Sequence, residues 1–251
     1  MKTLGGSTFI RSGNLYDYCY RESIKCLQEL CDKVSVVVIE TDDGTAEEVK
    51  SLADDKTKII CLPDSVWQAT RHLKKEQLSY FSNIAHSALD TDYFFYLQGD
   101  ECLHENSYDV IRTAIETPNP GGFLCRRHNL WKDCNHVLNV PIERRPCSAH
   151  VIRLAKRGTV SWDDAEQLYT QASEQFINEI ILVHYGFVRK KEVHAAKIRN
   201  MMTQIFQQGE PQEIVGMEVF DSTKWFNDED LLPFSIEQHP KIMREWIATR
   251  P

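Results

Sequence analysis

The chain has 251 residues, of which 42% are hydrophobic and 26% are charged, and both proportions are ordinary for a globular protein. They exclude a disordered chain, a collagen-like fibre and a small disulfide-stapled scaffold. The 29 Lys and Arg residues against 37 Asp and Glu give a formal net charge of −8, which argues against a uniformly basic protein that coats nucleic acid.

The N-terminus carries one basic residue, Lys2, and no apolar stretch after it, so we expect no secretory signal peptide. The apolar runs are far shorter than the about 20 residues of a membrane helix, and we expect a cytoplasmic protein with no transmembrane segment. None of the eight cysteines lies in a Cys-x-x-Cys pair, so we expect reduced thiols rather than a zinc site.

Over the first hundred residues, β-rich runs alternate with helical patterns. The predicted strands are Leu4–Ile10, 33–39, 58–62 and 93–97, and the predicted helices are 16–31, 46–52 and 72–89. Such strict alternation is typical of a mostly parallel sheet with helices on both faces. The sequence therefore predicts an α/β fold.

The pattern changes after residues 118–122. Residues 123–127, 137–140 and 150–154 have strand character without helices between them, which predicts a smaller mixed or antiparallel extension. A strand at 180–184 precedes a basic helix around 190–206, and loops with a terminal helix are expected over 233–247. No repeat or linker divides the chain, so we expect one domain over residues 1–251.

In an open parallel sheet, ligands bind at the carboxyl ends of the strands. There the sequence places acids, a histidine and basic residues: Arg11; Glu40, Asp42 and Asp43; Gln98, Asp100 and Glu101; and His184, Arg189 and Lys190. Together they suit a divalent cation that holds a diphosphate, because hard oxygen ligands take Mg²⁺ or Mn²⁺ and cationic side chains neutralise phosphates. Each motif alone also fits a turn, a helix cap, a structural histidine or a solvated helix face.

In this order the motifs resemble family 2 glycosyltransferases of the glycosyltransferase-A fold, in the subgroup that begins with a Thr-Phe-Ile-Arg segment. The matching pieces are Thr8-Phe9-Ile10-Arg11, Tyr16-Asp17-Tyr18, Glu22-Ser23-Ile24, Asp42-Asp43-Gly44-Thr45, Gln77, Asn83, Ala88-Leu89, Phe95-Tyr96-Leu97-Gln98-Gly99-Asp100-Glu101, Ser161-Trp162, Asp164-Ala165, His184-Tyr185-Gly186-Phe187-Val188-Arg189 and His239-Pro240 with Met243-Arg244-Glu245. They extend over nearly the whole chain. The resemblance implies one glycosyltransferase-A-type domain, in which residues 1–117 bind a nucleotide sugar and residues 118–251 face the acceptor.

The resemblance also implies roles for single residues. The donor, which we expect to be a UDP-sugar, would be bound by Arg11, Gln98, Arg189 and Lys190, with its base held by Asp42, Asp43 or Glu40. Gln98 stands where such enzymes carry the first acid of an Asp-any-Asp element, and it can still bind a ribose hydroxyl. Mn²⁺ or Mg²⁺ would be held by Asp100, with Glu101 and His184 as further ligands.

An inverting transferase needs a general base that takes the proton of the acceptor hydroxyl. Asp164 is the candidate, with Asp163 and Glu166 as competitors, and the ring of Trp162 can pack against a sugar. An acid that caps the start of a helix is an equally good interpretation of Asp164.

A strip between Cys125 and Val160 is basic, with eight basic residues against two acids. The basic residues are Arg126, Arg127, Lys132, Arg144, Arg145, Arg153, Lys156 and Arg157, and the acids are Asp133 and Glu143. A solvated surface explains the strip as well as an anionic acceptor does, whether a glycan, a lipid headgroup or DNA. Arg126, Arg127, Trp131 and Trp162 are the candidate acceptor-binding residues.

Three other functions stay open. A phage-type DNA glycosyltransferase would act on hydroxymethylated pyrimidines and stack Trp131 on an exposed base. A nucleotidyltransferase would carry a phosphate-binding loop after the first strand, which Arg11-Ser12-Gly13-Asn14 matches poorly. A binding module without catalysis is the third, and Gln98 in place of an acid favours it.

Overall fold

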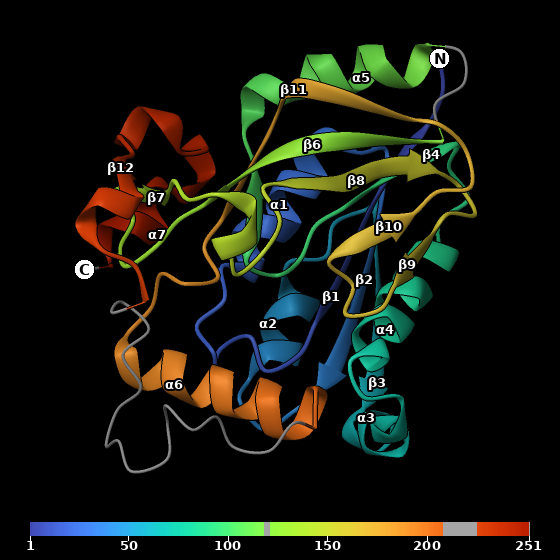
Figure 1. Ribbon diagram of the computed structural model, residues 1–251. Coiled ribbons are helices and arrows are strands. Elements are labelled where there is room, and N and C mark those ends of the chain that lie inside the picture. The colour runs from blue at the N-terminus through green and yellow to red at the C-terminus, as the bar shows by residue number, and fades with distance from the viewer. Residues whose placement is uncertain (118–120, 208–224, 251) are drawn as a thin grey trace.

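The computed structural model describes residues 1–117, 121–207 and 225–250, and it is built around an eight-stranded mixed sheet (Figure 1). The strand order is β3-β2-β1-β4-β8-β6-β11-β5. The strands of this sheet are β1 (Leu4–Ile10), β2 (Lys33–Glu40), β3 (Thr57–Pro63), β4 (Tyr93–Tyr96), β5 (Glu101–Leu103), β6 (Gly122–Asn129), β8 (His150–Lys156) and β11 (Glu174–His184). The predicted α/β fold is confirmed.

The first four strands form the parallel part of the sheet, since β1 pairs in parallel with both β2 and β4, and β2 with β3. Strand β2 shows why a β-branched run forms here. Its Val36 and Val38 side chains belong to the core under α1 (Tyr20–Leu30) and α2 (Thr45–Ser51), whereas Val37 and Ile39 pack with Phe81 of α4 (Glu76–Ser87). Both faces of the strand are covered, so an uninterrupted apolar run is favoured.

The other half of the sheet is mixed, as predicted from the run of strands without helices between them. Strand β8 is antiparallel to β4 and β6, β6 is parallel to β11, and β5 is antiparallel to the end of β11. Two small antiparallel pairs stand apart from the sheet: β9 (Val160–Trp162) with β10 (Gln167–Tyr169), and β7 (His136–Leu138) with β12 (Leu231–Pro233). The expected single domain stays a prediction, but strands from both halves of the chain share one sheet.

The predicted helices differ from the observed ones mainly at their ends. The helix expected over 72–89 is interrupted, because Lys74 has a positive φ of 55°. The chain forms α3 (Asp64–Ala69), the short 3₁₀ helix η1 (Arg71–Leu73) and then α4. The helix expected over 16–31 begins only at Tyr20. Residues 118–120, in the segment where the sequence pattern changes, lie outside the described residues, and so do residues 208–224. The last described helix is α7 (Arg244–Ala248).

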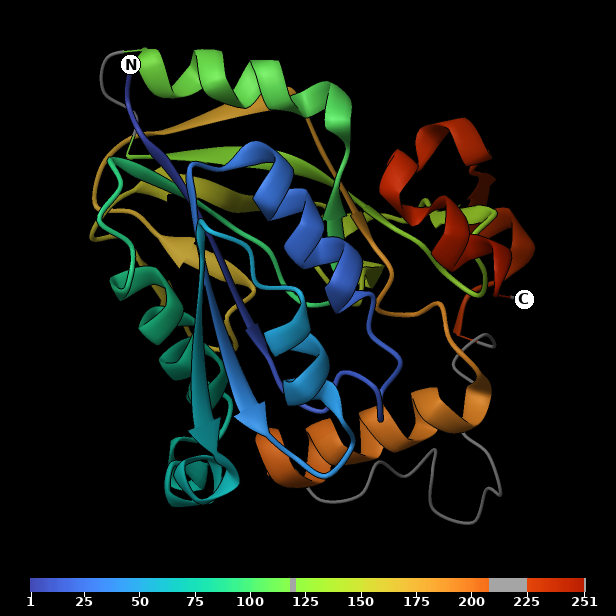
Figure 2. The same ribbon diagram turned by 180° about the vertical axis from the view of Figure 1, so that it is seen from behind.

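Helix α6 (Lys191–Asn200) continues into a π-helical turn, η4 (Met201–Ile205), as the basic pattern at 190–206 predicts. In Figures 1 and 2, α6 lies at the edge of the molecule where β2 and β3 end. Gln204 of η4 accepts a hydrogen bond from Arg71 of η1, which ties this segment to the turn before α4. Within the described ranges, none of the helices combines the length and the apolar character needed to cross a bilayer.

A buried ion-pair network joins three strands of the mixed half. The carboxylate of Glu101 (β5) accepts hydrogen bonds from Arg153 (β8) at 2.8 and 2.9 Å and from Arg127 (β6) at 3.1 Å. All three side chains are buried. Burial alone would raise the pKa of Glu101, but the two guanidinium groups outweigh it and lower the pKa to about 2.

Replacing Glu101 with Gln should destabilise the protein strongly, because two buried arginines would lose their counter-charge. We expect a loss of about 3–5 kcal/mol in the free energy of unfolding at neutral pH, measured by urea denaturation. The contribution of Glu101 is present above the ordinary carboxyl pKa and is lost as the pH falls toward about 2. The exposed Glu143→Gln is the matched control and should change stability by less than about 0.5 kcal/mol. Equal stability of the two variants would contradict the network's role.

Candidate functional site

A cavity of about 410 Å³ opens at the carboxyl ends of β1 and β4, and α6 contributes one of its walls. Polar residues from several separate segments line it, among them Arg11 after β1; Gln98 and Asp100 after β4; Asp164 and Glu166 between β9 and β10; His184 at the end of β11; and Lys197 of α6. This volume is typical of a site for a small organic ligand. The cavity therefore lies at the edge of the sheet where the sequence-based argument from strand ends expects a ligand.

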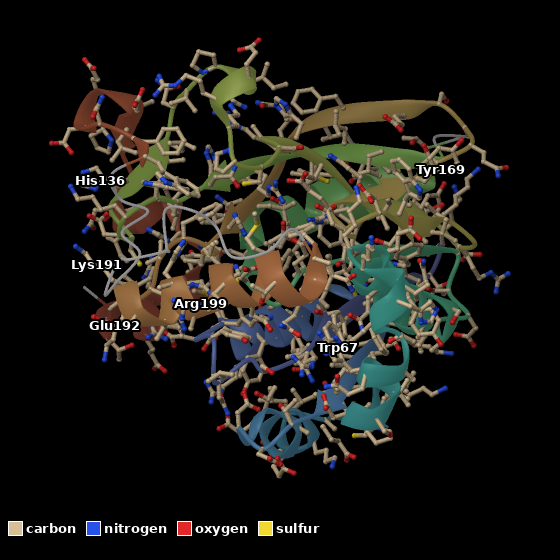
Figure 3. The ribbon with its side chains drawn as sticks, turned by 60° about the horizontal axis from the view of Figure 1, so that its bottom comes forward. Trp67, His136, Tyr169, Lys191, Glu192 and Arg199 are labelled. Carbon is tan, nitrogen blue, oxygen red and sulfur yellow. The ribbon has the colours of Figure 1, made fainter. Side chains whose placement is uncertain are left out.

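One wall of the cavity is aromatic. Phe9 of β1 and Trp67 of α3 line it, and both rings stack with Phe81 at centroid distances of 5.2 and 5.3 Å. The guanidinium of Arg11 lies 4.5 Å from the Trp67 ring and donates a hydrogen bond to Asp64 at 3.1 Å. Figure 3 looks onto α6 and shows Trp67 beyond its end. The wall offers a flat apolar surface next to a fixed positive charge.

The centre of the cavity holds one acid among cations. The Oδ2 atom of Asp100 accepts a hydrogen bond from Nζ of Lys197 at 3.0 Å, and it lies 3.7 Å from both His184 Nε2 and Arg189 Nη2. Asp100 is only 7% exposed. Burial alone would raise its pKa, but Lys197, His184 and Arg189 hold the pKa well below its usual range.

The two cations beside Asp100 are fixed by different contacts. Arg189 donates to the carbonyl oxygen of Tyr16 at 2.7 Å, and its guanidinium lies 5.0 Å from the ring of Tyr18. Lys197 also approaches that ring, at 5.1 Å, and lines the cavity directly. Burial and the nearby Arg189 lower the pKa of Lys197 to about 8, although Asp100 opposes the shift.

The turn after β11 depends on the absence of a side chain at Gly186. A Cβ atom there would collide with the imidazole of His184 and would lie 3.1 Å from Oδ2 of Asp100. The backbone N–H of Tyr185 donates to the carbonyl oxygen of Asp100 at 2.8 Å. Glycine therefore allows the end of β11 to pack directly on the loop that carries Asp100.

The side chains predicted to bind a metal do not fit one. Both oxygens of Glu101 are bound by Arg127 and Arg153, so Glu101 is corrected from a ligand to a structural ion-pair partner. In the described part of the chain, no three His, Cys, Asp or Glu residues form a metal-binding group. A divalent cation on Asp100 would lie within about 5 Å of the Lys197 ammonium, a repulsion on the order of 6–7 kcal/mol at an effective dielectric constant of about 20.

Asp164 lies in the turn between β9 and β10, not at the start of a helix, so the helix-cap interpretation is wrong. The turn is tight, with φ of 56° at Asp163 and 63° at Ala165. Burial raises the pKa of Asp164, and the negative charges of Glu166 and Asp163 raise it further. Its two competitors are engaged elsewhere, because Asp163 pairs with Lys75 at 2.8 Å and Glu166 pairs with Arg127.

The acids predicted to hold the donor base are not among the residues that line the cavity. Glu40 is exposed and pairs with Lys50 at 3.1 Å, and Asp42 is exposed in the following turn. Asp43 accepts hydrogen bonds from Thr45 and from the backbone of Leu15, so its observed role is that of a turn acid. Of the cations predicted there, Lys190 is exposed just before α6.

The predicted acceptor residues are scattered. Trp131 is 1% exposed and packs on Phe187 at a ring distance of 4.4 Å, so its predicted stacking on an acceptor is wrong. Arg127 lines the cavity but is buried in its ion pairs. Trp162 is 66% exposed at the β9–β10 hairpin, and Arg126 is exposed on β6.

The basic strip does not form one free cationic face. Arg153 and Arg127 are buried, Arg144 pairs with Asp230 at 2.9 Å, and Lys132 pairs with Asp228 at 3.4 Å. The local charge of the sequence therefore overstates the charge that a ligand would meet.

Sequence reasoning missed Trp67, Asp64 and, above all, Lys197. A signal for Lys197 exists, because His194, Lys197, Ile198 and Met201 recur at helical spacing and define one face of the basic helix. That face is the inner one: His194 is buried, and Lys197, Ile198 and Met201 line the cavity.

No protein-family model matches the chain, and no curated protein matches it in sequence. Its structure is similar to S. aureus TarS in complex with UDP-GlcNAc, with a TM-score of 0.48 and 11% identity over 81% of this chain and 66% of that one. The chain spans 65% of another TarS 1–349 structure and 39% of a longer TarS chain.

Two further similar structures are synthases. Mannosyl-3-phosphoglycerate synthase from Rubrobacter xylanophilus gives a TM-score of 0.43 and 14% identity over 93% of this chain and 86% of that one. Glucosyl-3-phosphoglycerate synthase from Mycobacterium tuberculosis, in complex with Mn²⁺, UDP and glucosyl-3-phosphoglycerate, gives 0.44 and 12% over 84% and 82%.

Proposed function

We propose that this chain is a glycosyltransferase that moves a sugar from a nucleotide-sugar donor to an acceptor hydroxyl with inversion. The observation that carries the proposal is a single cavity lined by both Asp164, an acid with a raised pKa, and Lys197, a cation whose side chain is 12% exposed. The first can take a proton and the second can stabilise a departing anion. Neither alone would distinguish this cavity from an ordinary binding site.

The aromatic wall is the proposed place of the donor base. Trp67 and Phe9 provide a flat surface, and Arg11 lies beside them, held by Asp64. Gln98 also lines the cavity, where its amide is in reach of a ribose hydroxyl once its contact with the carbonyl of Ala165, now 3.2 Å, is exchanged. We take UDP-sugars as the donors to test first, since UDP is the nucleotide bound by TarS and by the mycobacterial synthase in their solved complexes.

The proposed transfer is a direct displacement. The acceptor oxygen bonds to the anomeric carbon while the bond from that carbon to the diphosphate oxygen breaks, and its electron pair leaves with the diphosphate. The proton of the acceptor hydroxyl passes to the carboxylate of Asp164. No step is assigned to Mn²⁺ or Mg²⁺, because the side chains predicted to hold the ion do not form a ligand set.

An anionic acceptor stays part of the proposal. Arg126 and His150 are both exposed and lie opposite each other in the register of β6 and β8. A DNA acceptor loses its main support, because Trp131 is buried and most of the basic strip is engaged in internal contacts. Release of UDP from any UDP-sugar would also separate this proposal from a binding module without catalysis.

Replacing Asp164 with Asn should lower kcat by about 10²–10⁴-fold, because the amide cannot take the acceptor proton. UDP binding, measured by calorimetry, should stay within about twofold, since the acid beside Lys197 and Arg189 is Asp100 and not Asp164. Asp163→Asn is the matched control, because Asp163 pairs with Lys75, and it should keep most of the activity. Equal losses of kcat and UDP affinity in Asp164→Asn would contradict the assignment.

The pH dependence of kcat should show an acid limb that belongs to Asp164. The base must be ionised, so kcat falls as the pH drops through its pKa. Because burial raises that pKa, the midpoint should lie above the ordinary aspartate value of about 3.9. The measurement is kcat between pH 3 and 8 in saturating donor, with circular dichroism to confirm that the fold persists. A limb at or below the ordinary value would rule out Asp164 as the base.

A further inference from the structure

We propose that Lys197, supported by Arg189, supplies the positive charge that neutralises the donor diphosphate, and that the site works without a divalent metal ion. The inference rests on the proposed function, because it concerns the leaving group of that transfer. It departs from the sequence-based expectation, in which Asp100 holds Mn²⁺ or Mg²⁺.

The ammonium of Lys197 lies where an ion bound to Asp100 would be expected. Its Nζ atom donates to Oδ2 of Asp100 at 3.0 Å and to the carbonyl oxygen of Gly186 at 3.4 Å. One carboxylate oxygen and one carbonyl oxygen thus bind the ammonium, and oxygens of this kind would also bind a metal ion. Lys197 still lines the cavity, so a ligand can reach it from the open side.

The charge balance of the cavity favours an anion over a metal. Glu101 and Glu166 are balanced by Arg127 and Arg153, which bind them in the buried network. Around Asp100 that leaves one carboxylate against Lys197 and Arg189, a local surplus of one positive charge, while Asp164 is a further carboxylate of the cavity lining. A divalent ion at Asp100 would add two positive charges to this group, with one carboxylate to offset them. The glutamine at position 98 points the same way, because it removes the second carboxylate that the motif would carry.

The amphipathic pattern of helix α6 places Lys197 next to Asp100. His194 and Ala195 are buried, and Lys197, Ile198 and Met201 face the cavity, so one face of the helix is turned inward. Lys191, Glu192 and Arg199 are exposed on the other side, where Figure 3 labels them. The ring of Tyr18 packs between α6 and Arg189 and contacts both cations, at 5.1 Å from Lys197 and 5.0 Å from Arg189.

In the transfer, negative charge builds on the diphosphate oxygen as its bond to the anomeric carbon breaks. As an ammonium Lys197 has three N–H donors, of which two contact Asp100 and Gly186, so one is left for a diphosphate oxygen and no proton transfer is needed. The side chain of Arg189 has no exposed surface, so it cannot contact the diphosphate directly. Its positive charge lies behind Asp100 and adds to the positive potential that stabilises the leaving diphosphate. Asp100 is then a positioning residue that orients Lys197.

The test is calorimetric binding of UDP to the full-length protein, first in EDTA and then with added Mn²⁺. We expect the two dissociation constants to agree within about twofold, because Lys197 replaces the ion. Lys197→Met should weaken UDP binding at least about tenfold in both buffers, and Lys197→Arg should restore most of it, since it keeps the charge. Lys191→Met, an exposed lysine on the same helix, is the matched control and should bind as the wild type does.

The outcomes separate the two proposals. UDP binding that requires Mn²⁺ would overturn the inference about Lys197 and leave the glycosyltransferase proposal standing. Failure of UDP and of every other nucleoside diphosphate to bind in either buffer would overturn the proposed function, and the inference with it. Thermal unfolding of each variant checks folding, and the wild-type comparison in EDTA decides the question even if Lys197→Met is unstable.

Discussion

The contact on which the site depends is the ion pair between Asp100 and Lys197. It joins the loop after β4 to α6, two segments separated by 97 residues, and it lies next to His184 at the end of β11. Asp100 is nearly buried, and a buried carboxylate without a counter-charge would be strongly unfavourable. The cations that stabilise it leave a local positive charge around Asp100, so the contact that joins the two walls is also the one that we propose favours an anionic ligand.

The mixed half of the sheet positions Asp100 and His184 beside each other. The turn between β4 and β5 places Asp100 and Glu101 side by side, yet the two acids meet different environments. Glu101 faces the guanidinium groups of Arg127 and Arg153 inside the sheet, whereas Asp100 faces the cavity. The short β5 pairs with the end of β11, opposite Glu101 at His184, which brings the histidine beside the acidic turn. Of these two neighbours in sequence, Glu101 therefore has a structural role and Asp100 belongs to the candidate site.

The sequence predicts what local patterns determine and misses what distant packing determines. The β-branched run at 33–39 identifies a buried strand, and the strand-end rule brings Arg11, Gln98, Asp100 and His184 to one cavity. Trp131 looks like a surface aromatic in a basic strip, but Phe187 and Trp225 cover it. Lys197 looks like one more charge on a solvated helix, because its partner Asp100 is remote in sequence. Only the packed structure shows that this lysine meets the acid predicted to hold a metal.

Hydrogen exchange of the wild-type protein with and without UDP, in EDTA, tests the central claim most directly. If the nucleotide binds in the cavity beside Lys197, backbone amides of α6 and of residues 98–101 should exchange more slowly when UDP is bound, because the ligand stabilises both walls. The antiparallel pair of β7 and β12, whose residues do not line the cavity, should be unchanged. Protection that is absent from α6, or that appears only away from the cavity, would contradict the account.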